Sequence, residues 1–176
     1  MTSMVNFDVA NLKILIVEDN KQFRFLLRTI LEALDIKNLR EASNGEEALE
    51  VLKNFKADMA IVDWRMDDVD GIECIRRIRS GEGGCDSYLP IVMMTAYSGM
   101  GLAKGARDAG VNEFLRKPVE ARQLIRAVVD VIDSPKPFVK TSDYFGPDRR
   151  RKNQPFEHDE FRQQQEFLIP PEEYRS

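Results

Sequence analysis

Short apolar runs that stop at a polar residue recur along this sequence, and they restrict the fold more than any other feature. Three of them are continuous: KILIV at 13–17, MAIV at 59–62 and IVMM at 91–94. An apolar run of four or five residues predicts a strand buried on both faces, which is typical of parallel sheets. Weaker strand signals lie at 39–42 and 113–116. The sequence therefore predicts five short strands.

Segments with helical periodicity separate the expected strands. Apolar residues recur three and four positions apart in five segments, as they do in helices that pack on a sheet. These segments are 21–34, the stretch containing 48–55, the stretch from Gly71 to the glycine-rich turn at 80–84, about 102–109, and the stretch carrying 119–132. Strands that alternate with helices predict right-handed crossovers. The expected fold class is α/β, with a five-stranded parallel sheet and helices on both faces.

A change of composition after Asp133 divides the chain. Its 176 residues, of which 43% are hydrophobic and 32% charged, suffice for one globular domain plus an extension. Prolines at 134–137 interrupt the last helix, and the residues beyond are polar with isolated aromatic side chains. We therefore expect a lead at 1–11, a domain at 12–133 and an extension at 134–176 without an output domain.

Neither a membrane nor a nucleic acid is an expected partner. No apolar run approaches the ~18 residues of a spanning helix, and the first residues lack the pattern of a signal peptide. The basic run at 149–152 is offset by acidic residues of the same extension, and the net charge of the chain is −4, which does not attract nucleic acid. We expect a cytoplasmic protein.

Polar side chains follow the expected strands at the points where the strands end. Glu18 and Asp19 follow the first strand, Asp63 the third, Thr95 the fourth and Lys117 the fifth. Because ligands of open α/β sheets bind outside the carboxyl ends of the strands, these side chains should converge on one site. Carboxylates suit a hard cation, so we expect Mg²⁺ there, with Mn²⁺ as an alternative.

The same residues suit phosphoryl transfer. An aspartate can attack phosphorus as a covalent nucleophile, and Asp63 occupies the central strand of the expected sheet. Thr95 offers a hydrogen-bond donor and Lys117 a positive charge to phosphoryl oxygens. Taken singly, each residue could also be an ordinary cap, strand-end hydroxyl or surface charge.

Four motifs occur in a familiar order: ILIVEDN, IVDWRMDDVDG, MMTAYS and FLRKP. Together they resemble the receiver domain of two-component response regulators of the chemotaxis-regulator type, from about Leu12 to Asp133. The resemblance implies a flavodoxin-like (βα)5 fold with strand order 2-1-3-4-5. It also implies that Asp63 is the phosphoacceptor. Mg²⁺ would be held by Glu18, Asp19, Asp63 and the main-chain carbonyl of Arg65.

The resemblance assigns further roles near this site. Thr95 matches the switch hydroxyl and Lys117 the phosphate-binding lysine, and Phe114 matches the aromatic residue that switches with Thr95. A cis peptide bond is expected between Lys117 and Pro118. Asp67 departs from the family, which usually has proline there, and Arg65 stands where side chains tune the lifetime of the phosphorylated state.

The resemblance implies a single-domain response regulator. It would accept a phosphoryl group from a histidine kinase or phosphotransfer protein and signal through changed contacts with an output protein, with a homodimer as a further option. It would be no enzyme beyond its own phosphorylation and dephosphorylation. The alternatives are a phosphorelay intermediate, a pseudo-receiver scaffold and a small aspartyl-phosphate phosphohydrolase, although a DxD arrangement is missing.

Two aromatic features lie outside the expected site. Phe25 falls on the polar side of the first helix, where it could contact a partner or simply be an exposed apolar residue. The extension carries more aromatic residues than disordered segments usually have, among them Phe138, Tyr144 and Phe145. We expect it to dock on the receiver or on a partner.

Overall fold

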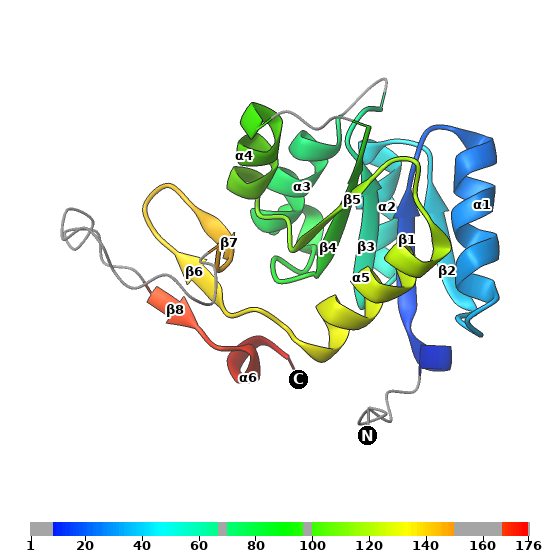
Figure 1. Ribbon diagram of the computed structural model, residues 1–176. Helices are drawn as coiled ribbons and strands as arrows, with labels where there is room; N and C mark the ends of the chain where they lie inside the picture. The colour runs from blue at the N-terminus through cyan, green and yellow to red at the C-terminus, as the bar shows by residue number, and fades with distance from the viewer. Residues whose placement is uncertain (1–8, 67–69, 97–99, 150–166, 176) are drawn as a thin grey trace.

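The computed structural model describes residues 9–66, 70–96, 100–149 and 167–175. Its centre is a parallel sheet of five strands in the order β2-β1-β3-β4-β5 (Figure 1). The strands are β1 (Lys13–Val17), β2 (Asn38–Ala42), β3 (Met59–Asp63), β4 (Ile91–Thr95) and β5 (Glu113–Arg116). The predicted fold class and strand order are confirmed.

Helices cover both faces of this sheet (Figure 1). Two of them, α1 (Lys21–Glu32) and α5 (Ala121–Asp133), bury their apolar sides against one face. The other face is covered by α2 (Gly45–Asn54), α3 (Gly71–Arg79) and α4 (Met100–Ala109). Short 3-10 turns, η1 (Val9–Asn11) and η2 (Glu82–Gly84), precede β1 and follow α3.

The continuous apolar runs follow from this two-sided burial. In β1, Ile14 and Ile16 belong to the cluster beneath α1 and α5, whereas Leu15 and Val17 belong to the cluster on the other face. Successive side chains of a strand point to opposite faces. A strand covered on both sides therefore has no solvent-facing position at which a polar residue would be favoured.

Side-chain caps fix where three helices begin. The side chains of Asn20, Asn44 and Asp70 accept hydrogen bonds from the third backbone N–H of α1, α2 and α3, which satisfies groups that lack a partner inside the helix. At its other end α1 stops at Glu32, earlier than the predicted Leu34. The N–H groups of Leu34 and Asp35 bond to carbonyls three residues back, and Asp35 has a φ of 65°, so the chain turns away.

The extension is ordered where the structure describes it. Strands β6 (Phe138–Lys140), β7 (Phe145–Pro147) and β8 (Phe167–Ile169) form an antiparallel sheet in the order β7-β6-β8, and α6 (Pro171–Tyr174) follows. Figure 1 shows this small sheet beside α3 and α4, at the end of the molecule where β4 begins. None of the helices described is long and apolar enough to span a membrane.

Candidate functional site

Three carboxylates meet at the carboxyl edge of the sheet. Glu18, Asp19 and Asp63 each place one oxygen so that the three lie within 4.8 Å of one another. Strand pairing explains the approach, because Val17 of β1 lies opposite Val62 of β3 and each acidic segment begins one residue later. The convergence expected from the strand ends is therefore present for these residues.

Lys117 joins two of these carboxylates. Its Nζ lies 2.9 Å from Glu18 Oε2 and 2.9 Å from Asp63 Oδ1. The backbone N–H of Lys117 donates to Thr95 O over 2.8 Å, and the Lys117–Pro118 peptide bond is cis. The ammonium also lies 4.4 Å from the ring centroid of Phe23 on α1, so Lys117 contacts residues of four segments.

Burial dominates the electrostatics of the site. Glu18 is 1% exposed and Asp63 5%. Burial raises the pKa of both carboxyl groups above their ordinary values, and the hydrogen bond from Lys117 opposes that rise without cancelling it. Burial alone would lower the pKa of Lys117, but its hydrogen bonds to Asp63 and Glu18 outweigh burial, and the pKa is raised. The lysine therefore stays charged between them.

The donor set fits a divalent cation with a preference for oxygen. One ammonium group faces three carboxylates, so the site carries an excess of negative charge that a cation would neutralise. Mg²⁺ is bound in proteins by one or two carboxylates together with waters and phosphate oxygens. The acidic residues could supply those carboxylates, with Asp19 the most exposed of the three.

The other predicted residues lie around this cluster at differing distances. Thr95 is buried at the end of β4, beside β3, because Met94 lies opposite Asp63. Arg65 is exposed in the loop after β3, in a hollow of about 400 Å³ that Trp64, Met66 and Asp70 also line. The assignment of its carbonyl to the metal stays a prediction. Asp67 lies outside the described residues.

Phe114 and Phe25 differ in burial. Phe114 is partly buried and packs on the core beneath α2, α3 and α4, so its role as a switch stays a prediction. Phe25 is 67% exposed on α1, next to the exposed Leu26. That exposure leaves room for a partner to bind at α1.

Arg24 is a contributor that the sequence analysis missed. Its Nη1 donates to the main-chain carbonyl of Glu18 over 2.5 Å and lies 3.5 Å from that of Asp19, and its Nε donates to Glu41 over 3.0 Å. Arg24 thus ties the acidic segment to α1 and β2. Its position a few residues after the acidic pair was the available signal, but the polar side of a helix indicates only an exposed charge.

Comparison with known proteins decides the family. The family model of the response regulator receiver domain matches residues 14–129. This chain belongs to that family. Chemotaxis protein CheY-3 of Vibrio cholerae is 36% identical over 114 residues, which are 65% of this chain and 86% of the relative. Chemotaxis protein CheY of Pseudomonas aeruginosa is 32% identical over 122 residues, 69% of this chain and 97% of the relative.

Solved receivers share the fold. The receiver domain of sensor histidine kinase PA1611 from Pseudomonas aeruginosa, described with a magnesium ion in its active site cleft, superposes with a TM-score of 0.63 at 28% identity, covering 70% of this chain and 98% of that one. A receiver domain of a modulated diguanylate cyclase from Desulfovibrio desulfuricans gives 0.61 at 31% identity, covering 69% and 93%. Phosphorylation and Mg²⁺ binding are typical of such receivers. The family match ends before the extension begins.

Proposed function

We propose that Asp63 accepts a phosphoryl group from a partner histidine kinase or phosphotransfer protein, and that the chain acts as a single-domain response regulator. The observation that carries this proposal is the pairing of Lys117 with a buried Asp63 inside a cluster of three carboxylates. An aspartate that only ended a strand or capped a turn would not require a half-buried lysine and two further acidic residues around it.

In the proposed transfer, a carboxylate oxygen of Asp63 forms the new O–P bond while the N–P bond of the donor phosphohistidine breaks and its electron pair returns to the imidazole. Lys117 moves from Asp63 to a phosphoryl oxygen, and Glu18 keeps the ammonium in place. Mg²⁺, held by Glu18, Asp19, Asp63 and the Arg65 carbonyl, would neutralise charge on the phosphoryl oxygens when bound, and Mn²⁺ could replace it.

The conformational change would pass from the site to the rest of the domain through the end of β4. The Thr95 hydroxyl would turn toward the new phosphoryl group, and Phe114 on the neighbouring strand would follow it. Such a modification shifts a population between two conformations that the protein already samples. The changed surface would then bind an output protein or a second copy of the chain, and Phe25 on α1 would contact the phosphodonor. We place these events in the cytoplasm.

Incubation with acetyl phosphate and Mg²⁺, followed by intact mass measurement, tests the proposal. We expect one added phosphoryl group on the wild type, none on Asp63→Asn, and normal uptake by Asp130→Asn, a control at an exposed aspartate of α5. Chelation of the metal should stop uptake. A wild type that gains no mass would support a pseudo-receiver scaffold instead, and an Asp63→Asn variant that gains as much as the wild type would show that Asp63 is not the acceptor.

Two alternatives have outcomes of their own. A phosphorelay intermediate would pass the group from Asp63 to a histidine phosphotransfer protein within the assay, so the label would move to that protein. A small phosphohydrolase would release phosphate from many phosphomonoesters in repeated turnovers. Single labelling without either result favours the response regulator.

A further inference from the structure

The extension meets the receiver through a cluster of aromatic rings. The receiver contributes Tyr88, from the loop before β4. Its ring centroid lies 5.0 Å from Phe138, 5.2 Å from Phe145 and 4.8 Å from Tyr174, all three from the extension. Phe138 is only 1% exposed. Ring pairs at these separations contribute beyond the apolar area that they bury, so this contact is a packed interface.

A buried arginine lies beneath these rings. Arg79, the last residue of α3, is 6% exposed, and its guanidinium group donates five hydrogen bonds to neutral oxygens. The acceptors are the carbonyl of Gly110 at 3.0 and 2.7 Å, those of Ser87 and Leu89 at 2.9 and 2.7 Å, and Asn112 Oδ1 at 3.1 Å. An arginine offers five N–H donors. All of its hydrogen-bonding capacity is therefore used inside the receiver.

The extension covers the face of this cation. The Cζ of Arg79 lies 5.1 Å from the ring centroid of Phe138, within the range of a cation–π interaction. Burial lowers the pKa of Arg79 to about 10. A buried charge that meets only neutral acceptors gains from an aromatic face. Arg79 and Tyr88 thus form a receptor surface for the aromatic side chains of the extension.

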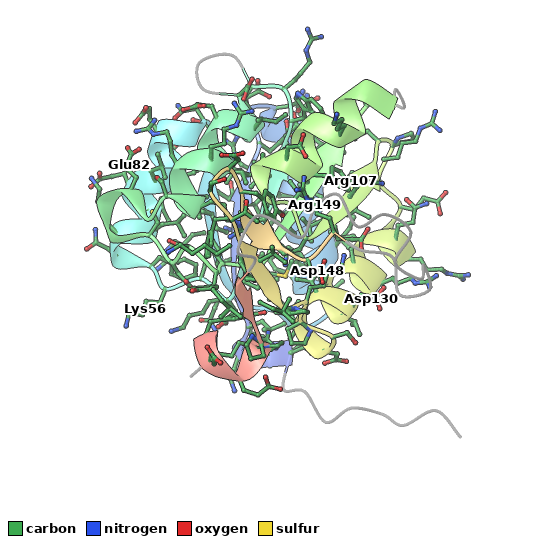
Figure 2. The ribbon with its side chains drawn as sticks, turned by 90° about the vertical axis from the view of Figure 1, so that its left-hand side faces the viewer. Lys56, Glu82, Arg107, Asp130, Asp148 and Arg149 are labelled. Atoms are coloured by element: carbon green, nitrogen blue, oxygen red, sulfur yellow. The ribbon has the colours of Figure 1, made fainter. Side chains whose placement is uncertain are left out.

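Helix α4 is the second element that the extension holds. Arg149 forms an ion pair with Asp108 near the end of α4, and Figure 2 views the molecule from this side. Gly110, directly after α4, is approached so closely that a Cβ on Gly146 would lie 2.8 Å from its Cα. The extension therefore contacts the C-terminal end of α4 through both charge and backbone.

The N-terminal end of α4 is close in sequence to Thr95, a residue of the candidate site. The helix begins at Met100, five residues after Thr95, and ends at Ala109. Ala106 and Ala109 are buried against the core, so the second half of the helix packs on the receiver. A displacement of the whole helix would change the position of Asp108 and Gly110 at its C-terminal end. One helix thus lies between the end of β4, which pairs with Asp63 of β3, and the extension.

We infer that the extension is a built-in ligand of the surface formed by Arg79, Tyr88, Asp108 and Gly110, and that its docking is coupled through α4 to Asp63, with the docked form favouring the unphosphorylated state. This inference rests on the proposed phosphorylation of Asp63. The direction follows from the contacts at the end of α4: a displacement of the helix on phosphorylation would separate Asp108 from Arg149 and Gly110 from Gly146. Coupling between two sites is reciprocal, so a weakened dock should ease phosphorylation.

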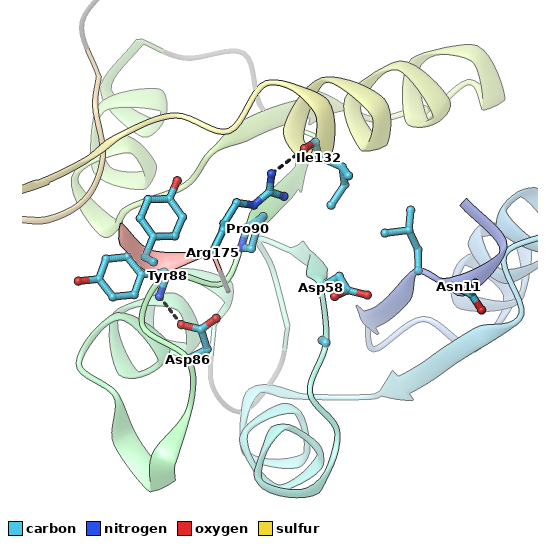
Figure 3. A pocket seen from close by; sticks show the side chains of 10 residues that line it. Asn11, Asp58, Asp86, Tyr88, Pro90, Ile132 and Arg175 are labelled. Atoms are coloured by element: carbon cyan, nitrogen blue, oxygen red, sulfur yellow. Dashed lines mark hydrogen bonds between the residues drawn. The ribbon is translucent and has the colours of Figure 1, made fainter. Parts of the chain in front are cut away.

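The last turn of the extension borders an open hollow. A pocket of about 460 Å³ lies between Tyr88, Asp58 and Arg175, and Figure 3 shows the side chains that line it. Arg175 donates a hydrogen bond to Ile132 O over 2.9 Å, and Tyr174 stacks on Tyr88 and donates its hydroxyl to Lys136 O. The end of the extension is therefore held by ring contacts and two hydrogen bonds beside this hollow, whereas Phe138 is fully buried.

Hydrogen exchange of the full chain tests the coupling directly. The probe is beryllofluoride with Mg²⁺, which mimics the phosphoryl group on the acceptor aspartate. We expect amides of residues 138–147 to exchange roughly tenfold faster with the mimic than without it, while amides of β1 stay protected. Unchanged exchange at 138–147, in a sample that binds the mimic, would overturn the coupling.

Variants measure the reciprocal effect on the rate of phosphoryl uptake from acetyl phosphate. Removal of the ion pair by Arg149→Gln should raise that rate roughly two- to fivefold. The matched control is Arg126→Gln on α5, which breaks the exposed pair with Asp130 away from the extension and should leave the rate unchanged. Phe138→Ala should raise the rate further, provided that its circular dichroism spectrum remains that of the wild type.

The outcomes separate the two proposals. A wild type that takes up no phosphoryl group removes the phosphoacceptor function and the coupling with it. Normal uptake at equal rates in the wild type, Arg149→Gln and a folded Phe138→Ala removes the coupling alone. Faster uptake in both extension variants and not in Arg126→Gln supports it.

Discussion

Each edge of the sheet holds a cation, half-buried Lys117 at one and buried Arg79 at the other, but the partners of the two cations differ. Lys117 at the carboxyl edge pairs with the carboxylates of Glu18 and Asp63, whereas Arg79 at the opposite edge meets carbonyls, one side-chain amide and an aromatic ring. Lys117 can exchange the carboxylate of Asp63 for a phosphoryl oxygen without being left unpaired. Carbonyl partners of Arg79 belong to loops that would have to unfold first.

The difference between the partners of Lys117 and those of Arg79 shows how one small domain combines a reactive site with a purely structural one. At the carboxyl edge, burial raises the pKa of Asp63 and Glu18 even though Lys117 is present, so the ionised site opposes folding. At the other edge every donor of Arg79 is satisfied. The first arrangement is suited to binding an ion and the second to holding loops and extension together.

The largest loss of stability should come from Arg79→Ala, which removes the hydrogen bonds at the edge of the sheet opposite the candidate site. The change leaves the carbonyls of Gly110, Ser87 and Leu89 without their donors, and we expect the free energy of unfolding to fall by about 3–5 kcal/mol. Urea unfolding followed by circular dichroism measures it. Arg122→Ala, at an exposed position of α5, is the control and should change stability by less than about 0.5 kcal/mol. A similar small loss for Arg79→Ala would show that Arg79 is dispensable.

Phe138→Ala should be nearly as costly, because it opens a cavity beneath the extension. Removal of a buried phenylalanine side chain costs about 3–5 kcal/mol, here with the loss of the cation–π contact to Arg79. One unfolding transition at lower urea would show that extension and receiver unfold together. Two separate transitions would contradict that. Leu168→Ala, which alters an exposed residue of β8, should leave the curve unchanged.

Asp63→Asn should raise the free energy of unfolding, because it removes a buried negative charge from the carboxyl edge of the sheet. We expect the metal-free variant to be more stable than the wild type near neutral pH by on the order of 1 kcal/mol. Mg²⁺ should then stabilise the wild type more than the variant. Thermal unfolding with and without Mg²⁺ measures both. A variant that is less stable in the absence of metal would show that Lys117 needs the charge of Asp63.

The pH dependence of this difference follows from the raised pKa of Asp63. Its folded state holds a proton more tightly than the unfolded chain, whose value is near 3.8. The stability that results is fully present below pH 3.8 and is lost as the pH rises through the raised pKa. The advantage of Asp63→Asn should therefore be largest near neutral pH and vanish as the pH approaches 3.8.

The smallest loss of stability should come from Tyr174→Phe in α6, the last turn of the extension. The change removes the hydrogen bond from the Tyr174 hydroxyl to Lys136 O, 2.5 Å long, but keeps the stacking on Tyr88. We expect a loss of about 0.5–1 kcal/mol, visible as faster amide exchange in β6. Tyr174→Ala, which also removes the stack, should accelerate it further. Equal rates for both variants would mean that the ring contributes nothing.

The sequence predicts the carboxyl edge well, for a topological reason. Glu18, Asp63 and Lys117 directly follow strands, and parallel strands present their ends at one edge. Strand order therefore brings these side chains together before any packing detail is known. The roles of Thr95, Phe114 and the Arg65 carbonyl stay predictions, because they concern a phosphorylated and metal-bound state.

The opposite edge could not be predicted in the same way. Arg79 follows Arg76 and Arg77 on the same helix, and arginines on such a helix are mostly exposed. Arg79 is buried by the loops that carry its carbonyl acceptors and by Phe138, which lies nearly sixty residues later in a segment without a strong strand pattern. The aromatic residues of the extension indicated docking, but not the surface on which it takes place. Contacts between distant segments depend on tertiary packing that local periodicity does not encode.

The close approach of Gly110 and Gly146 has an evolutionary consequence. Gly110 has a φ of 95°, which side chains rarely adopt, and a Cβ on Gly146 would also lie 2.5 Å from the Tyr144 hydroxyl. Neither glycine can be replaced while the two backbones stay in contact. In descendants that retain the extension both should persist, and in a lineage that discards it Gly146 disappears and Tyr88 becomes free to vary, while Arg79 keeps its hydrogen bonds inside the receiver.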